Sequence, residues 1–141
     1  MKKHLAYLLP VLLILLIGGV LWSQRLNEDA GVSRTLACAD LRQGCSVELD
    51  GTPVTVRMLG ALKPLSAFRV EVHAPQARRV EARFTMEGMD MGFNLYTLRA
   101  DKAGMFTASV TLPVCVSGRR DWVMQLRVDD SRLSVPFVTD M

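Results

Sequence analysis

The stretch CSVELDGTPVTVRM, residues 45–58, decides the fold class of this 141-residue chain. Apolar and polar residues alternate on both sides of Asp50-Gly51, and Asp-Gly between two alternating runs is a strong signal for a β-hairpin. The same period of two recurs downstream, at 68–74, 78–86, 93–100, 105–116, 122–130 and 132–140. About seven to eight short antiparallel strands at this spacing predict an all-β, immunoglobulin-like β-sandwich.

The alternation also predicts which side chains point into the core, because successive residues of a strand face opposite sides of the sheet. The residues expected to face inward are Val70, Val72, Val80, Phe84, Phe106, Val110, Leu112, Trp122, Leu126 and Val128.

A second, separate pattern lies at the N-terminus, where residues 5–22 contain no charge. Eighteen apolar residues are about the minimum for a transmembrane helix. Lys2 and Lys3 favour a cytoplasmic N-terminus, and Trp22 suits the membrane interface. A cleaved signal peptide is the alternative, but no Ala-x-Ala site follows at the right distance. The pattern predicts a cytoplasmic basic stub (1–4), a transmembrane helix (5–22), a juxtamembrane linker (23–44) and an extracytoplasmic β-sandwich domain (45–141).

The charge of the domain argues against nucleic-acid binding. Lys2, Lys3 and Arg25 flank the apolar segment, and the remaining basic residues equal the 14 acidic ones in number. The domain is therefore close to neutral and lacks the basic face that nucleic acids require. Enzyme chemistry is also not expected, since the sequence shows no nucleophile with a neighbouring base and no phosphate-binding glycine loop.

The three cysteines are informative in an oxidising compartment because their number is odd. Cys38 and Cys45 lie seven residues apart around a glycine-containing turn, and this spacing predicts a disulfide. Cys115 is left over. It is a buried small hydrophobe, an intermolecular bridge or a metal ligand.

The candidate functional stretch is MEGMDMG, residues 86–92. Thioethers and thiolates are soft donors that select Cu(I) among biological metals. Met89 and Met91 would share one face of an extended strand, and Met86 could reach them across the bend at Gly88. Cys115 could supply a thiolate from another strand. A partner-binding loop and simple packing are the alternatives, because methionine serves both purposes.

From residue 45 to 138 the chain resembles the YtkA-like and FixH-like membrane-associated domains. These have a Met-x-Met element, a Gly-x-aromatic strand, and then a Gly and a Trp that opens the next strand. The matching positions here are Met89 and Met91, Gly104 and Phe106, and Gly118 and Trp122. The resemblance implies an immunoglobulin-like fold at the outer face of the bacterial inner membrane, in the periplasm. It also implies a role near copper handling or respiratory-oxidase maturation.

Two positions depart from that family pattern: Asp90 stands where proline is frequent, and Cys115 stands where a methionine or apolar residue is common. The second change adds a stronger copper donor. The leading hypothesis is a membrane-tethered Cu(I)-binding protein that uses Met86, Met89, Met91 and Cys115. It would deliver copper to a membrane protein such as an oxidase or exporter. The alternative is a metal-free assembly module that docks such a partner through the methionine loop.

Overall fold

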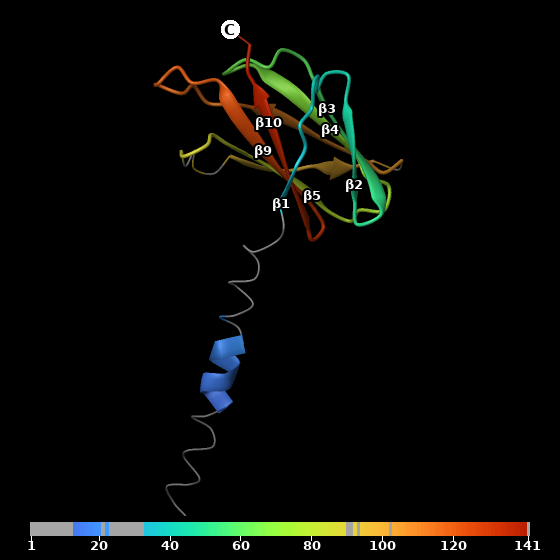
Figure 1. Cartoon of the computed structure of the whole chain (residues 1–141), viewed down its shortest axis with the longest axis vertical. Helices are drawn as coiled ribbons and strands as arrows, with labels where there is room; N and C mark the ends of the chain where they lie inside the picture. The colour runs from blue at the N-terminus through green and yellow to red at the C-terminus, as the bar shows by residue number, and fades with distance from the viewer. Residues whose placement is uncertain are drawn as a thin grey trace, which may run out of the picture. The chain divides into compact units, whose positions relative to one another are not determined.

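The computed structural model describes residues 13–20, 22, 33–89, 92, 94–101 and 103–140. The chain divides into two compact units, Met1–Gly31 and Val32–Met141. In the first unit, residues 13–20 are helical (Figure 1). None of the helical residues described form a helix long and apolar enough to cross a membrane. The predicted span at 5–22 lies partly outside the described residues and stays a prediction.

The second unit is built from strands, whose bounds are β1 (Ser33–Thr35), β2 (Cys45–Leu49), β3 (Thr52–Leu59), β4 (Ala67–His73), β5 (Val80–Thr85), β6 (Leu95–Thr97), β7 (Arg99–Ala100), β8 (Met105–Thr111), β9 (Asp121–Val128) and β10 (Ser131–Val138). One sheet has the order β1-β10-β9-β5-β6, and the other has the order β2-β3-β4-β8-β7. The two sheets enclose the core (Figure 1). The predicted all-β, sandwich-like fold is confirmed at this level.

The hairpin predicted from Asp50-Gly51 joins β2 to β3. Both turn residues have positive φ, 48° for Asp50 and 78° for Gly51. A two-residue turn of this kind matches the twist of the flanking strands, and Asp and Gly are the residues that tolerate it. The register places Val47 opposite Val54, and a hydrogen bond of 2.8 Å joins the hydroxyls of Ser46 and Thr55.

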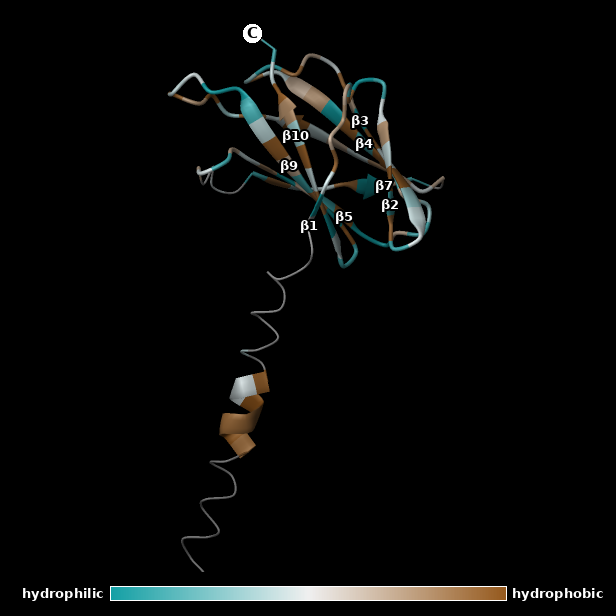
Figure 2. Cartoon of the chain, viewed as in Figure 1, coloured by the Kyte–Doolittle hydropathy of each residue, from teal (hydrophilic) through white to brown (hydrophobic). Residues whose placement is uncertain are grey.

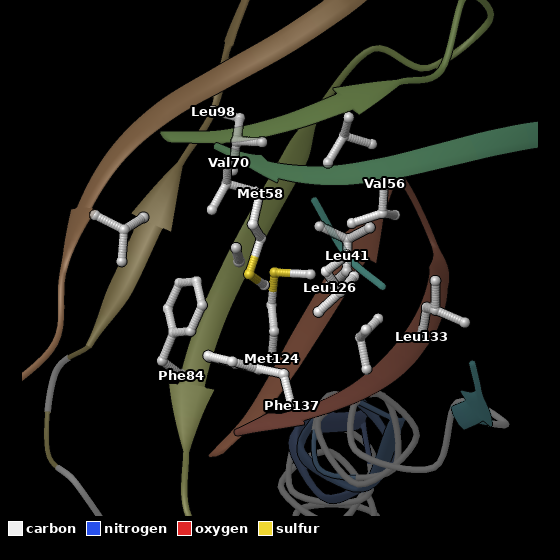
Figure 3. Packing of buried hydrophobic residues seen from close by; sticks show 14 of the residues in the cluster. Leu41, Val56, Met58, Val70, Phe84, Leu98, Met124, Leu126, Leu133 and Phe137 are labelled. Carbon is white, nitrogen blue, oxygen red and sulfur yellow. The ribbon is translucent and has the colours of Figure 1, made fainter. Parts of the chain in front are cut away.

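All ten side chains predicted to face inward are buried. Along the strands, apolar residues alternate with polar ones, which Figure 2 shows as bands of brown and teal. Phe84 packs edge-to-face against Phe68, Tyr96 and Phe137, with ring centroids 6.1, 5.9 and 6.2 Å apart. Beside it the sulfurs of Met58 and Met124 face each other across the core (Figure 3). These two methionines lie far apart in the sequence.

The run at 93–100, predicted as one strand, is divided between the two sheets. β6 pairs with β5 in one sheet, and β7 pairs with β8 in the other. Leu98 lies between them, is only 4% exposed, and donates its amide to the carbonyl of Val80. A buried residue at the crossing lets the chain change sheets while the alternation continues, so the period alone does not reveal the change.

The folded unit also begins earlier than predicted. Residues 33–44 fall within the predicted linker, yet β1 pairs in parallel with β10, with Arg34 opposite Leu133. Leu41 belongs to the hydrophobic core, and its carbonyl accepts the amide of Met58. The predicted boundary at residue 45 is therefore too late, because a three-residue edge strand is too short to produce a visible period.

The topology separates the two ends of the sandwich. One end, hereafter called the site end, contains the segments at 36–44, 60–66, 86–89, 112–120 and 138–140. The β2–β3 and β9–β10 turns lie at the other. Since β1 runs parallel to β10, the chain enters the sandwich at the end opposite the site end (Figure 1).

Candidate soft-metal site

The methionine stretch begins with a tight turn directly after β5. The amide of Met89 donates to the carbonyl of Met86 at 3.1 Å, and the two residues form an isolated β-bridge. Gly88 has φ of 75°, a conformation that glycine adopts at the third position of a type II turn without steric cost. The predicted bend at Glu87-Gly88 is thus present in the structure.

The turn sends its two methionines into different environments. Met86 is 2% exposed and belongs to the hydrophobic core, whereas Met89 is 37% exposed. Both line an open cleft of about 670 Å³ on the outer face of the β10-β9-β5 sheet, together with Arg83, Gln125 and Pro136. Burial favours the packing interpretation for Met86, while Met89 is accessible to a metal or a partner. Met91 lies outside the described residues, so its position as a third donor stays a prediction.

Cys115 lies in the segment that connects β8 to β9. It is a free, half-buried thiol, and its sulfur lies 3.0 Å from the hydroxyl of Ser117. The amide of Gly118 donates to the carbonyl of Cys115 and closes the turn. The hydrogen bond from the Ser117 side chain, then that from its backbone, and the nearby Arg119 lower the pKa of the Cys115 thiol below its usual value. These contacts favour the thiolate, the form that binds soft metals.

Arg119 joins the Cys115 segment to the methionine turn. Its Nη1 donates to the carbonyl oxygen of Glu87 at 3.0 Å. Its Nε donates to Asp121 Oδ1 at 3.0 Å, and its Nη2 forms an ion pair with the same carboxylate. The hydrogen bond from Arg119 in turn lowers the pKa of Asp121. One guanidinium therefore holds the two segments side by side at the site end.

Sequence reasoning did not single out Arg119, Ser117 or Glu87. The stretch SGRRD (117–121) has only the composition of a turn. Nothing in the spacing signals that Arg119 reaches a backbone carbonyl 32 residues away. His73 is exposed at the last position of β4, opposite Met105. That position is at the other end of the sandwich from the methionine turn.

The predicted pair Cys38 and Cys45 lies at disulfide-bonding distance, with Cα atoms 5.9 Å apart. Cys38 also lines a second cleft at the site end, of about 520 Å³, together with Glu87, Asp121 and Trp122. The paired cysteines therefore lie near the candidate site without supplying a free sulfur to it.

Among the residues that the structure describes, no three His, Cys, Asp or Glu side chains gather in a way that could hold a metal ion.

The environment of Cys115 predicts a pH dependence that can be measured without any metal. We expect Ser117→Ala to raise the pKa of the thiol, because it removes the largest cause of the lowering. Arg119→Gln should raise the pKa less, since Arg119 contributes less to the lowering. The rate of alkylation by iodoacetamide against pH, with the Cys38–Cys45 disulfide intact, measures both shifts. Ser109→Ala, on the exposed face of β8, is the matched control.

The same lowered pKa has a consequence for stability. Between the folded and unfolded pKa values of Cys115 the unfolded chain binds the extra proton, so the free energy of unfolding rises as pH increases through that window.

Equal alkylation profiles for the native chain and Ser117→Ala would show that the hydroxyl does not stabilise the thiolate.

Comparison with known proteins adds no assignment. No family model matches the chain, and neither a curated protein nor a solved structure does. The likeness to the YtkA-like and FixH-like domains therefore remains a resemblance in motifs.

Proposed function

We propose that this chain is a membrane-tethered, periplasmic protein whose immunoglobulin-like β-sandwich binds Cu(I) at the site end. The observation that carries the proposal is the Arg119 contact, because it brings the turn with Met89 next to the segment with Cys115. Two segments that each contain a sulfur donor and lie far apart in the sequence are joined through this guanidinium. Such a donor set has the softness that Cu(I) prefers over the harder divalent ions.

The donors we assign are the Cys115 thiolate, the Met89 thioether and the predicted third thioether, Met91. Met86 supports the turn from the core rather than facing solvent. The cleft beside Met89 offers an open approach to the site. Copper bound there would be delivered to, or held near, a membrane protein such as an oxidase or exporter. A tether at 5–22 would raise the effective concentration of the site near that partner.

A competition titration tests the proposal. The full chain in neutral detergent micelles is titrated anaerobically with Cu(I) against a chromogenic chelator. We expect Cys115→Ser, and the pair Met89→Leu with Met91→Leu, each to weaken binding by about tenfold or more, about 1.4 kcal/mol per tenfold. Met86→Leu is the matched control, since it removes a thioether from the same turn but from a buried position. The copper proposal fails if the native chain binds no better than the Met89/Met91 double variant.

The second candidate function is a metal-free assembly module that docks a partner through the methionine loop. The exposure of Met89 favours it, because an accessible methionine also makes an adaptable apolar contact. The same leucine substitutions separate the two functions. Leucine keeps most of the apolar volume, so docking should survive a change that abolishes binding of a soft metal.

A further inference from the structure

The hydroxyl of Tyr96 makes a second link between the two segments that contain the sulfur donors. Tyr96 is the middle residue of β6, which follows the methionine turn along the chain. Its hydroxyl donates to the carbonyl of Thr111 at 3.0 Å and accepts the amide of Thr111 at 3.3 Å. Thr111 is the last residue of β8, before the segment that contains Cys115. The link therefore crosses from one sheet to the other.

The backbone of β8 explains why this hydroxyl is held. β7, the neighbour of β8 at the edge of the sheet, is a two-residue strand that pairs with Phe106 and Thr107. Thr111 lies beyond that pairing, and a residue of an antiparallel strand directs its amide and carbonyl to the same side. The Tyr96 hydroxyl takes the place of a strand neighbour and satisfies both groups. The ring is also held, because it packs edge-to-face against Phe84 with centroids 5.9 Å apart.

The Tyr96 link and the Arg119 link lie at opposite ends of the same two segments. Arg119, which ends one segment, donates to the carbonyl of Glu87, which begins the other. Tyr96 follows the methionine segment and bonds to Thr111, which precedes the Cys115 segment. Residues 87–96 and 111–119 are therefore the two arms of a closed ring, hereafter called the clasped ring, with a hydrogen-bonded contact at each end.

The assigned donors all fall between these two contacts in the sequence. Cys115 is midway between Thr111 and Arg119 on one arm, and Met89 and Met91 belong to the other. Fixing both arms at both ends limits how far the donors can separate, which raises their effective concentration toward one another. An arm that is fixed at one end samples a larger volume and loses more entropy when both arms bind one ligand.

We propose that Tyr96 is a positioning residue of the candidate site, because its hydroxyl closes the clasped ring and keeps the methionine arm beside the Cys115 arm. Tyr96 supplies no ligand of its own and acts through Thr111. Its effect on copper binding rests on the proposed function, whereas closure of the ring is a property of the protein without metal.

Cross-linking of the two arms tests ring closure in the absence of copper. In the full chain in neutral detergent micelles, Met89→Cys is joined to Cys115 by a short bismaleimide, with the Cys38–Cys45 disulfide intact. The rate, followed by mass spectrometry, is normalised to the reaction of each thiol with N-ethylmaleimide. We expect the cross-link to form about fivefold more slowly when Tyr96→Phe is added, the effect of losing one ordinary hydrogen bond.

Ser46→Ala is the matched control for Tyr96→Phe. It removes a hydroxyl hydrogen bond of 2.8 Å between β2 and β3, in a part of the sheet that β4 separates from β8. Melting temperatures are measured for both variants. If Tyr96→Phe acts through a general loss of stability, Ser46→Ala should slow the cross-link in proportion to its own fall in melting temperature.

The competition titration with Cu(I) gives the second readout. Tyr96→Phe should weaken binding by about fivefold. The iodoacetamide profile of Cys115 should stay that of the native chain, since none of the causes that lower the pKa of this thiol involves Tyr96. A shifted profile would mean that Tyr96 acts on the thiol rather than on the position of its segment, and would overturn the proposal.

The two experiments separate failure of this proposal from failure of the copper function. Equal cross-linking rates with and without Tyr96→Phe would overturn the role of Tyr96, as would the absence of any cross-link. Copper binding that Tyr96→Phe leaves unchanged would also overturn it while the copper function stands. Slower cross-linking in Tyr96→Phe supports the positioning role even if the native chain binds no copper, and in that case the copper function alone fails.

Discussion

Replacing Phe84 with alanine is expected to lower the free energy of unfolding by about 3–5 kcal/mol. The ring is fully buried and packs edge-to-face against three aromatic rings that come from β4, β6 and β10. Both sheets contribute to this cluster, so truncation opens a cavity in the middle of the sandwich. The three rings are held by their own strands and can collapse into the cavity only in part.

Urea unfolding followed by the circular dichroism of the β-sheet measures the loss. Phe84→Leu is the graded control, because leucine keeps much of the volume and should cost clearly less than alanine. A loss below about 1 kcal/mol for Phe84→Ala would mean that the core does not close around this ring in solution.

The second large effect is expected at Gly104, which precedes β8. A Cβ added there would lie 2.5 Å from the Cα of Pro75, in the β4–β5 loop, and 3.1 Å from its Cβ. The loop cannot retreat freely, because the amide of Ala74 donates to the carbonyl of Gly104 at 3.0 Å. Overpacking in Gly104→Ala should therefore lower the free energy of unfolding by about 1–3 kcal/mol. The positive φ at this position adds a further cost for a residue that carries a Cβ.

Gly88→Ala is a matched control for this prediction. The φ of Gly88 is 75° against 74° for Gly104, but nothing lies within 4 Å of a Cβ at Gly88. The difference in unfolding free energy between the two alanine variants isolates the contact with Pro75. Equal losses would show that backbone conformation alone accounts for both.

The copper prediction differs from these two because it changes binding while leaving the fold intact. Met89→Leu retains the apolar volume of an exposed residue. Melting temperatures measured beside each titration therefore show whether a loss of binding reflects unfolding.

Much of the sandwich could be predicted, because its determinants are local. Asp50-Gly51 selects the turn that joins β2 to β3, and period-two alternation marks the buried faces of the long strands. The short separation of Cys38 and Cys45 was enough to predict their pairing. Elements that depend on contacts between distant segments were missed. These are the three-residue β1, which forms only against β10, and the change of sheet at Leu98.

In the candidate site, too, local features could be predicted from the sequence, whereas contacts between distant segments could not. The sequence by itself determined which donor atoms are available: thioethers spaced around a glycine bend and one leftover thiol. Only the tertiary structure decided that Met86 is buried while Met89 is accessible, and that Arg119 brings the Cys115 segment to the methionine turn. The reason is physical: alternation and turn chemistry act within a few residues, whereas burial and the reach of a guanidinium depend on which distant segments the sheets place side by side.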